Sequence, residues 1–177
     1  NSSIACIGTG GLGSPLLIYL AAAGIGRIGV VDFDVVEDSN LQRQIIHTTN
    51  SIGILKTHSA KEHILKINPS CKVDLFNQKL TSGNALEILK NYDVICDCSD
   101  NFPTRYLIND ACKILKKPNI YGSIARFEGQ VSVFNLNEES PNYRDLIPTP
   151  PPRELIPSCS EAGVMGILPG IIGTIQA

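Results

Sequence analysis

Six residues near the start of the chain, GTGGLG at positions 8–13, constrain the fold more than any other feature. They follow the apolar run Ser3–Ile7 and precede a stretch of helix-forming residues. A glycine turn between a strand and a helix is the setting in which backbone amides and the helix dipole bind phosphate. We therefore predict that Gly8 makes a tight turn, Gly10 lets a phosphate approach the backbone, and Gly13 lets helix and strand pack closely.

A second apolar run, Arg27–Val31, ends at Asp32. In a dinucleotide-binding fold, a carboxylate at this point accepts hydrogen bonds from the ribose hydroxyls. Taken alone, the glycines and Asp32 also fit an NAD-dependent oxidoreductase, and this alternative stays open at this point.

Strand-like and helix-like stretches alternate along most of the chain. The predicted helices are 14–23, 56–67, 84–89 and 103–115, and the predicted strands after the second are 72–76, 94–98 and 119–123. This alternation predicts a Rossmann-like, doubly wound α/β fold with a mainly parallel sheet. Residues 130–135 predict an antiparallel edge strand, and the proline-rich residues 137–157 predict a long crossover loop. The uncharged run 162–177 predicts a buried or interface helix.

Length and composition favour a single domain over residues 1–177, which the motifs described below make an ATP-binding one. The chain has 177 residues, 43% of them hydrophobic, and a net charge of −2. With this net charge we expect no basic surface that would bind nucleic acid or an anionic membrane. The six cysteines follow no disulfide spacing, which indicates a reducing compartment. The chain starts within its first predicted strand, so we expect a piece of a longer protein, truncated at both ends.

Polar residues follow the predicted strands where a ligand would bind in such a fold. They include Asp32, Asp34 and Arg43 after the second strand and the Ser-Asp-Asn sequence 99–101 after a later one, with Arg105 beyond it. Hydride transfer does not need an arginine and a second carboxylate here. A nucleoside triphosphate does, because its phosphates bind arginine and lysine while a carboxylate such as Asp100 holds magnesium.

Longer motifs carry a resemblance that spans nearly the whole chain. GTGGLG is followed by DFDVVEDSNLQRQ, by Gly53 with Lys56, by CSDN at 98–101, and by Cys159 before EAGV. In this order they resemble the adenylyltransferases that activate ubiquitin-like sulfur carriers, a group that includes molybdopterin-synthase and thiamine-biosynthesis adenylyltransferases and the ubiquitin-activating enzymes. The closest likeness is to the molybdopterin-synthase type.

The resemblance implies a reaction between ATP and the C-terminal glycine of a carrier protein, giving an acyl-adenylate and pyrophosphate. It implies that Gly11 lies against the phosphates, that Asp32 binds the ribose, and that Asp100 binds magnesium with Asn101 beside it. Arg43, Lys56 and Asp100 are then the expected catalytic residues. The expected triphosphate-binding residues are Ser39, Asn40, Leu41, Gln42, Arg43 and Lys56.

The resemblance also implies partners. We expect a sulfur carrier that ends in Gly-Gly, first of all the molybdopterin-synthase small subunit, although thiamine synthesis and tRNA thiolation stay open. A homodimer is expected, in the cytoplasm or, for an organelle-encoded chain, in the plastid stroma. Two rival functions remain: the NAD-dependent oxidoreductase, and a catalytically inactive, carrier-binding half of a two-subunit activating enzyme.

Cysteine and histidine positions bear on zinc and on covalent chemistry. Asn142 and Asp145 stand where family members with a structural zinc have cysteines, so we expect no zinc site. Cys159 has polar neighbours, and in some relatives the matching cysteine forms a thioester or persulfide with the carrier. His47, His58 and His63 lack partners at metal-ligand spacing and are interpreted as surface or helix-face residues.

Overall fold

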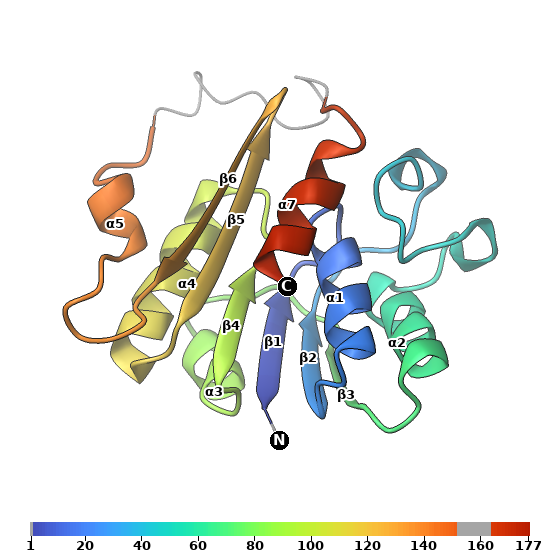
Figure 1. Cartoon of the computed structure of the whole chain (residues 1–177), viewed down its shortest axis with the longest axis horizontal. Helices are drawn as coiled ribbons and strands as arrows, with labels where there is room; N and C mark the ends of the chain where they lie inside the picture. Colours follow the sequence, from blue (N-terminus) through green and yellow to red (C-terminus); the bar gives the residue numbers. More distant parts are fainter. Residues whose placement is uncertain (1, 152–163) are drawn as a thin grey trace.

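The computed structural model describes residues 2–151 and 164–177 and has one six-stranded sheet at its centre (Figure 1). The strands lie in the order β3-β2-β1-β4-β5-β6. Their bounds are β1 Ser3–Ile7, β2 Arg27–Val31, β3 Lys72–Phe76, β4 Val94–Asp97, β5 Asn119–Ala125 and β6 Glu128–Phe134. The helices are α1 Gly13–Ala22, α2 Lys56–Ile67, α3 Ala85–Leu89, α4 Phe102–Leu115, α5 Tyr143–Leu146 and α7 Leu168–Gln176, with short 3₁₀ turns η1 Asp38–Asn40 and η2 Thr49–Ser51.

The sheet confirms the predicted doubly wound α/β fold. Strands β1 to β5 run parallel, and β6 pairs antiparallel with β5 through the register Asn119↔Phe134. The strand order reverses between β1 and β4, which pair through Ile4↔Val94. At such a reversal the loops leaving the two strands diverge, and the crevice between them is where ligands bind in this kind of fold.

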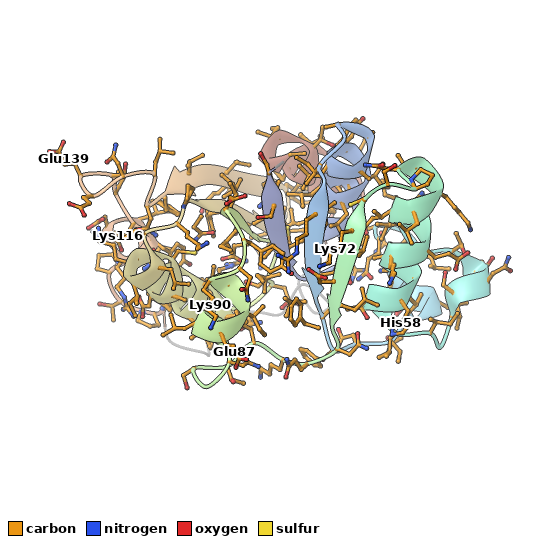
Figure 2. All side chains as sticks on the ribbon, turned by 90° about the horizontal axis from the view of Figure 1, so that it is seen from below. His58, Lys72, Glu87, Lys90, Lys116 and Glu139 are labelled. Atoms are coloured by element: carbon orange, nitrogen blue, oxygen red, sulfur yellow. The ribbon has the colours of Figure 1, made fainter. Side chains whose placement is uncertain are left out.

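Helices cover both faces of the sheet, as the view from below makes plain (Figure 2). Helices α1, α2 and α7 lie on one face, and α3 and α4 lie on the other. Side chains of β1 alternate between the two cores, with Ile4 and Cys6 in the first and Ala5 and Ile7 in the second. Strands that are buried on both faces have to be apolar throughout, which is why β1 and β2 are continuous hydrophobic runs.

The predicted loop 137–157 contains a short helix that the sequence did not indicate. Helix α5 spans four residues and begins at a capping box formed by Asn142 and Asp145. Four residues are too few to show a hydrophobic period, so pattern analysis missed it. Residues 152–157 of the predicted loop lie outside the described residues.

The run 162–177 contains α7, which begins at Leu168 with a proline in its first turn. A proline at this position leaves no backbone donor unpaired, which favours the start of a helix there. Pro169, Ile172, Gly173 and Gln176 form its buried side. No helix within residues 2–151 and 164–177 has the length and apolarity needed to cross a bilayer.

Candidate active site

The glycine loop forms one wall of a cleft at the carboxyl end of the sheet. Gly8 has a φ of 96°, which side chains disfavour, and this conformation makes the predicted tight turn. A Cβ on Gly13 would lie 2.1 Å from the carbonyl oxygen of Gly8, so only glycine lets α1 start this close to the loop. Among the described residues, the backbone amides of Gly10, Gly11 and Leu12 have no hydrogen-bond partner. Free amides at a helix N-terminus attract anions.

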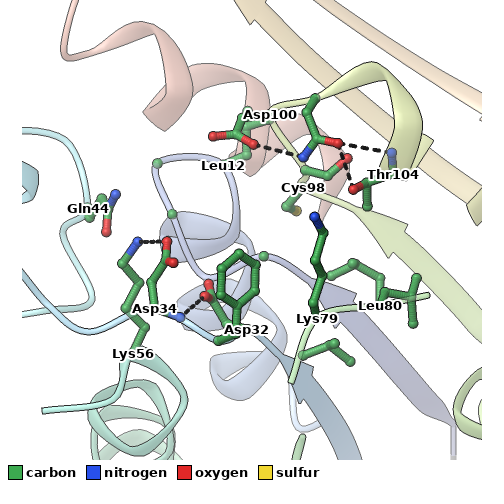
Figure 3. A pocket seen from close by; sticks show the side chains of 18 of the residues that line it. Leu12, Asp32, Asp34, Gln44, Lys56, Lys79, Leu80, Cys98, Asp100 and Thr104 are labelled. Atoms are coloured by element: carbon green, nitrogen blue, oxygen red, sulfur yellow. Dashed lines mark hydrogen bonds and ion pairs between the residues drawn. The ribbon is translucent and has the colours of Figure 1, made fainter. Parts of the chain in front are cut away.

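Asp32 directly follows β2 and faces the glycine loop across the strand ends (Figure 3). Its Oδ2 accepts hydrogen bonds from the backbone amide of Thr9 at 2.8 Å and from the Thr9 hydroxyl at 2.7 Å. Its Oδ1 accepts one from the backbone amide of Asp34 at 3.0 Å. Thr9, which the sequence analysis did not select, therefore fixes the orientation of the Asp32 carboxylate.

Two cations reach the cleft from the segment between β2 and α2. Lys56 is buried at the first position of α2, and its Nζ lies 2.9 Å from Oδ2 of Asp34. Arg43 donates from Nη1 to the carbonyl oxygen of Ser39 at 3.3 Å and makes no ion pair with any described residue. Its side chain borders Gly11, since a Cβ there would lie 3.7 Å from Arg43 Cγ. The Arg43 side chain thus lies beside the glycine loop and lines the cleft, and it has no ion-pair partner among the described residues.

Asp100 lies on the opposite side of the cleft, at the N-terminus of α4. Asn101 caps this helix by accepting hydrogen bonds from the Thr104 amide at 3.0 Å and the Thr104 hydroxyl at 2.7 Å. The exposed Asp100 carboxylate accepts one hydrogen bond, from Asn101 Nδ2 at 3.2 Å. A carboxylate with free oxygens in a cleft is a ligand of the kind that magnesium prefers.

A buried polar cluster lies beneath Asp100. Oδ1 of Asp97 accepts hydrogen bonds from the amide of Ser99 at 3.0 Å and its hydroxyl at 2.6 Å, and Arg105 donates to the Ser99 carbonyl at 3.3 Å. Burial raises the pKa of the Asp97 carboxyl, while the hydrogen bonds from Ser99 and the charge of Arg105 oppose this rise. Asp97 lies within the predicted apolar strand 94–98, where a single carboxylate does not interrupt the apolar pattern and so gives no sign of a polar cluster.

The cleft has a volume of about 260 Å³. Most of the predicted site residues line it: Gly8, Gly10, Gly11, Asp32, Arg43, Lys56, Asp100 and Asn101. Gln44, Gln78 and Lys79 line it as well and were not predicted. Lys79 follows β3, so the same strand-end reasoning that selected Asp32 and Asp100 could have found it.

Five predicted residues do not line the cleft. These are Gly13, Ser39, Asn40, Leu41 and Gln42. Ser39 and Asn40 form the turn η1, and the backbone of Asn40 accepts hydrogen bonds from the amides of Arg43 and Gln44. The turn thus positions Arg43 and Gln44, which line the cleft.

Comparison with known proteins identifies this arrangement. The family model described as "ThiF family" matches residues 1–177. The chain belongs to the ThiF family. This match confirms the resemblance that the motifs indicated. Residues of the glycine loop and of the CSDN sequence line opposite sides of the cleft.

Two curated relatives of this ThiF-family chain are close. A probable molybdopterin-synthase adenylyltransferase from Porphyra purpurea is 57% identical over 180 residues, which cover 100% of this chain and 46% of the relative. A sulfur carrier protein adenylyltransferase from Thermus thermophilus is 50% identical over 181 residues, covering 100% of this chain and 67% of the relative. The chain thus spans about half to two thirds of the length of these relatives.

A solved structure supports the likeness. The tRNA N6-threonylcarbamoyladenosine dehydratase TcdA of E. coli, in complex with ATP, is 30% identical with a TM-score of 0.65. The match covers 67% of this chain and 49% of TcdA.

One histidine of the ThiF-family chain lies elsewhere than predicted. His47 is buried, with Nδ1 2.9 Å from the Ser59 hydroxyl and Nε2 3.0 Å from the Thr9 carbonyl oxygen. Burial lowers the pKa of its imidazole. The surface interpretation was wrong for His47, because the segment after η1 folds inward against the glycine loop. His58 is exposed, as predicted (Figure 2).

Asn142 and Asp145, which replace the zinc-binding cysteines of some family members, lie at the start of α5 and within it. The Asp145 carboxylate accepts hydrogen bonds from the backbone amide and the Nδ2 of Asn142, at 2.8 and 2.6 Å. The structure finds no group of three or more potential metal ligands among histidine, cysteine, aspartate and glutamate within the described residues. Cys159 lies outside the described residues, so its predicted covalent role stays a prediction.

Proposed function

We propose that this protein adenylylates the C-terminal glycine of a small ubiquitin-like sulfur carrier, most directly the molybdopterin-synthase small subunit. An oxygen of the glycine carboxylate attacks the α-phosphorus of ATP. The bond from this phosphorus to the bridging oxygen of the β-phosphate breaks, and pyrophosphate departs. The product is an acyl-adenylate, which activates the glycine for sulfur transfer.

One observation carries this proposal: free amides, the cations Arg43 and Lys56 and the exposed Asp100 carboxylate line one cleft. The amides of Gly10 and Gly11 and the Arg43 guanidinium are free of strong partners among the described residues. Asp100 faces them from the loop just before α4. This is a donor and charge set for a triphosphate with a divalent cation, not for a flat nicotinamide ring. The names of the two close relatives support the same reaction.

The residues of the cleft would act by positioning and by neutralising charge. Asp32, already oriented by Thr9, would accept the ribose hydroxyls. The glycine-loop amides, Arg43 and Lys56 would hold the phosphates and stabilise the charge that grows on the departing pyrophosphate. The attacking group is a carboxylate that is already ionised, so no protein base is required.

Asp100 is the residue that would hold magnesium. Its carboxylate is exposed in the cleft and has a single contact with a neighbouring side chain, so its oxygens are free to bind a cation. Magnesium bound there would neutralise the phosphate oxygens of ATP.

ATP–pyrophosphate exchange tests the proposal. The full-length protein is assayed with magnesium and carriers ending in Gly-Gly, and the wild type is compared with Asp100→Ala. The matched control is Asp110→Ala, an aspartate of α4 that does not line the cleft. We expect carrier-dependent exchange in the wild type and the control, and a loss of about 100-fold or more in Asp100→Ala.

Two results would count against the proposal. If folded wild-type protein binds ATP but shows no exchange with any carrier, the chain is a binding module of the inactive-half kind. If Asp100→Ala keeps full exchange, Asp100 is not the magnesium ligand. The carrier that supports exchange best distinguishes molybdenum cofactor synthesis from thiamine synthesis and tRNA thiolation.

We also propose a homodimer formed through the outer side of α7. Ile167, Ile171 and Ile175 are spaced by four residues, so they form one stripe, and each has at least half of its surface exposed. Such a stripe is typical of an interface. Sedimentation of the full-length protein should give a dimer, and Ile171→Asp should shift it toward monomer; an unchanged mass would overturn this interface.

Two further proposals concern cysteine chemistry. The Cys159 thiolate would attack the acyl carbon of the adenylate, forming a thioester with the carrier and releasing AMP. If a sulfane-sulfur donor has first converted the thiol to a persulfide, the outer sulfur would attack the same carbon and again release AMP. A carrier adduct that thiols release and that Cys159→Ser lacks would support this. The Asn142–Asp145 pair would leave α5 without zinc, which elemental analysis of the purified protein tests.

We place the protein in the cytoplasm or, if it is organelle-encoded, in the plastid stroma. All five cysteines within the described residues are buried free thiols. Free thiols persist in reducing compartments.

A further inference from the structure

His47 lies where three segments of the cleft meet. Its ring is buried between the glycine loop, which provides the Thr9 carbonyl at 3.0 Å, and α2, which provides the Ser59 hydroxyl at 2.9 Å. The third segment is the stretch between η1 and η2, which carries His47 itself and Gln44. The ring does not line the cleft, so its effect on a ligand has to pass through its neighbours.

The two contacts fix the state of the imidazole. The Thr9 carbonyl can only accept a hydrogen bond, so Nε2 of His47 must carry the proton and donate. In the neutral ring Nδ1 is then an acceptor, and the Ser59 hydroxyl donates to it. Burial keeps the ring neutral because it lowers the pKa of the imidazole.

Each neighbour of His47 connects to a group proposed to bind ATP. Thr9, whose carbonyl is held by His47, orients the Asp32 carboxylate with its amide and hydroxyl at 2.8 and 2.7 Å. Ser59 lies one turn after Lys56 on α2. A continuous path of hydrogen bonds and backbone thus runs from Asp32 through Thr9 and His47 to the helix that begins with Lys56.

We propose that His47 is a positioning residue for ATP: its donation to the Thr9 carbonyl fixes the glycine loop relative to α2. This inference rests on the proposed function. Without the bond, the Thr9 carbonyl loses its partner and the loop can shift against Lys56. Interactions that bind substrate and transition state alike would be lost, which raises KM and leaves kcat nearly unchanged.

Two conservative variants separate the contacts. In His47→Gln the amide nitrogen reaches about as far as Nε2 and can still donate to Thr9. In His47→Asn the shorter amide reaches only the Ser59 side. We expect the KM for ATP to rise about tenfold in His47→Asn, the value of one lost hydrogen bond, and to stay within about threefold of wild type in His47→Gln. In both variants kcat stays within about twofold.

The controls separate positioning from general stability. Asn109 of α4 is buried outside the cleft, and its side-chain oxygen accepts a hydrogen bond from the backbone amide of Tyr143. Asn109→Ala should therefore lower the melting temperature without changing the KM for ATP. Ser59→Ala removes the other contact of His47 and should raise the KM in the same direction by a smaller factor, and it keeps the test valid if His47→Asn does not fold.

The outcomes are distinct. Equal KM values for the wild type, Ser59→Ala and whichever His47 variants fold would overturn the inference, as would an equal rise in Asn109→Ala. If the wild-type protein itself binds no ATP, the proposed function has failed and not the role of His47.

Discussion

The two ends of the sheet use the same kinds of side chain in opposite ways. Toward the amino end of the sheet, Arg27 Nε of β2 lies 2.6 Å from Oδ2 of Asp74 on β3, and the Tyr92 hydroxyl donates to the same oxygen at 3.0 Å. The guanidinium also lies 5.0 Å from the Tyr92 ring centroid. At the carboxyl end, Arg43 makes no ion pair with a described residue and Asp100 receives one weak hydrogen bond.

The difference distinguishes a scaffold from a binding site. Polar side chains that are already paired with one another have no hydrogen bonds left for a ligand, and their pairing holds the strands and helices together. Hydrogen-bond donors and acceptors that line a cleft without a partner in the protein are available to bind a ligand. Charged residues alone would not separate the two ends, since Arg27 and Asp74 lie toward one and Arg43 and Asp100 lie at the other. The two ends differ in whether their charged groups are paired with each other.

The largest effect is expected from Arg43→Ala, which removes an open cation. Because the guanidinium would stabilise charge on the departing pyrophosphate, kcat/KM for ATP should fall by about 100-fold or more. Steady-state ATP–pyrophosphate exchange measures this, and the melting temperature should change little because Arg43 makes only one side-chain hydrogen bond to the described residues. A fall in stability with normal exchange would mean that Arg43 belongs to the scaffold.

An intermediate effect of the opposite kind is expected from Asp74→Ala at the amino end. The variant leaves the buried Tyr92 hydroxyl without its partner, which costs about 1–3 kcal/mol in free energy of unfolding. Urea denaturation measures the loss, while the KM for ATP should stay at its wild-type value. A KM raised tenfold in folded Asp74→Ala would break the division between the two ends.

The smallest effect concerns an exposed closed pair, Arg144 on α5 and Asp110 on α4, joined by two hydrogen bonds of 2.8 and 2.6 Å. The hydrogen bonds from Arg144 lower the pKa of Asp110 below its ordinary 3.8. A lowered folded-state pKa means that the pair's contribution is complete above that ordinary value and is lost as the pH falls through the folded-state pKa. The pair is exposed, so the contribution is about 0.5 kcal/mol.

The matched variant for this pair is Asp110→Asn. Its unfolding free energy should lie below wild type at pH 7, and the difference should shrink as the pH falls below 3.8. A difference that persists at low pH would assign the effect to packing instead of charge.

Much of this arrangement follows from the sequence because parallel strands are buried on both faces. β1, β2 and β3 have the predicted bounds. β1 and β2 are short apolar runs that end at glycine or polar residues, whereas the edge strand β3 alternates apolar and charged residues. Strand-end reasoning also brought Asp32, Arg43 and Asp100 to one edge, where the cleft is.

What the sequence did not indicate depends on contacts between distant segments. His47 reads as a surface residue until η1 and η2 bring it against Thr9, and nothing in its neighbours predicts that. Asp97 lies hidden in an apolar run, and its burial becomes tolerable only through Ser99 and Arg105. α5 depends on the capping box of Asn142 and Asp145, a local signal with no hydrophobic period to support it.

The pairing of β1 with β4 has a consequence for synthesis of the chain on the ribosome. One side of the cleft comes from the segments after β1 and β2 and the other from the segment after β4, and α2, β3 and α3 lie between them in the sequence. When β1, α1 and β2 have emerged from the ribosome, the nascent chain contains the glycine loop but not yet β4 or Asp100, which follows it. Contacts between segments so far apart form late in folding. If the protein binds ATP as proposed, the growing polypeptide would acquire nucleotide affinity only after α4 has left the exit tunnel, and retention of the nascent chain on immobilised ATP would report that moment.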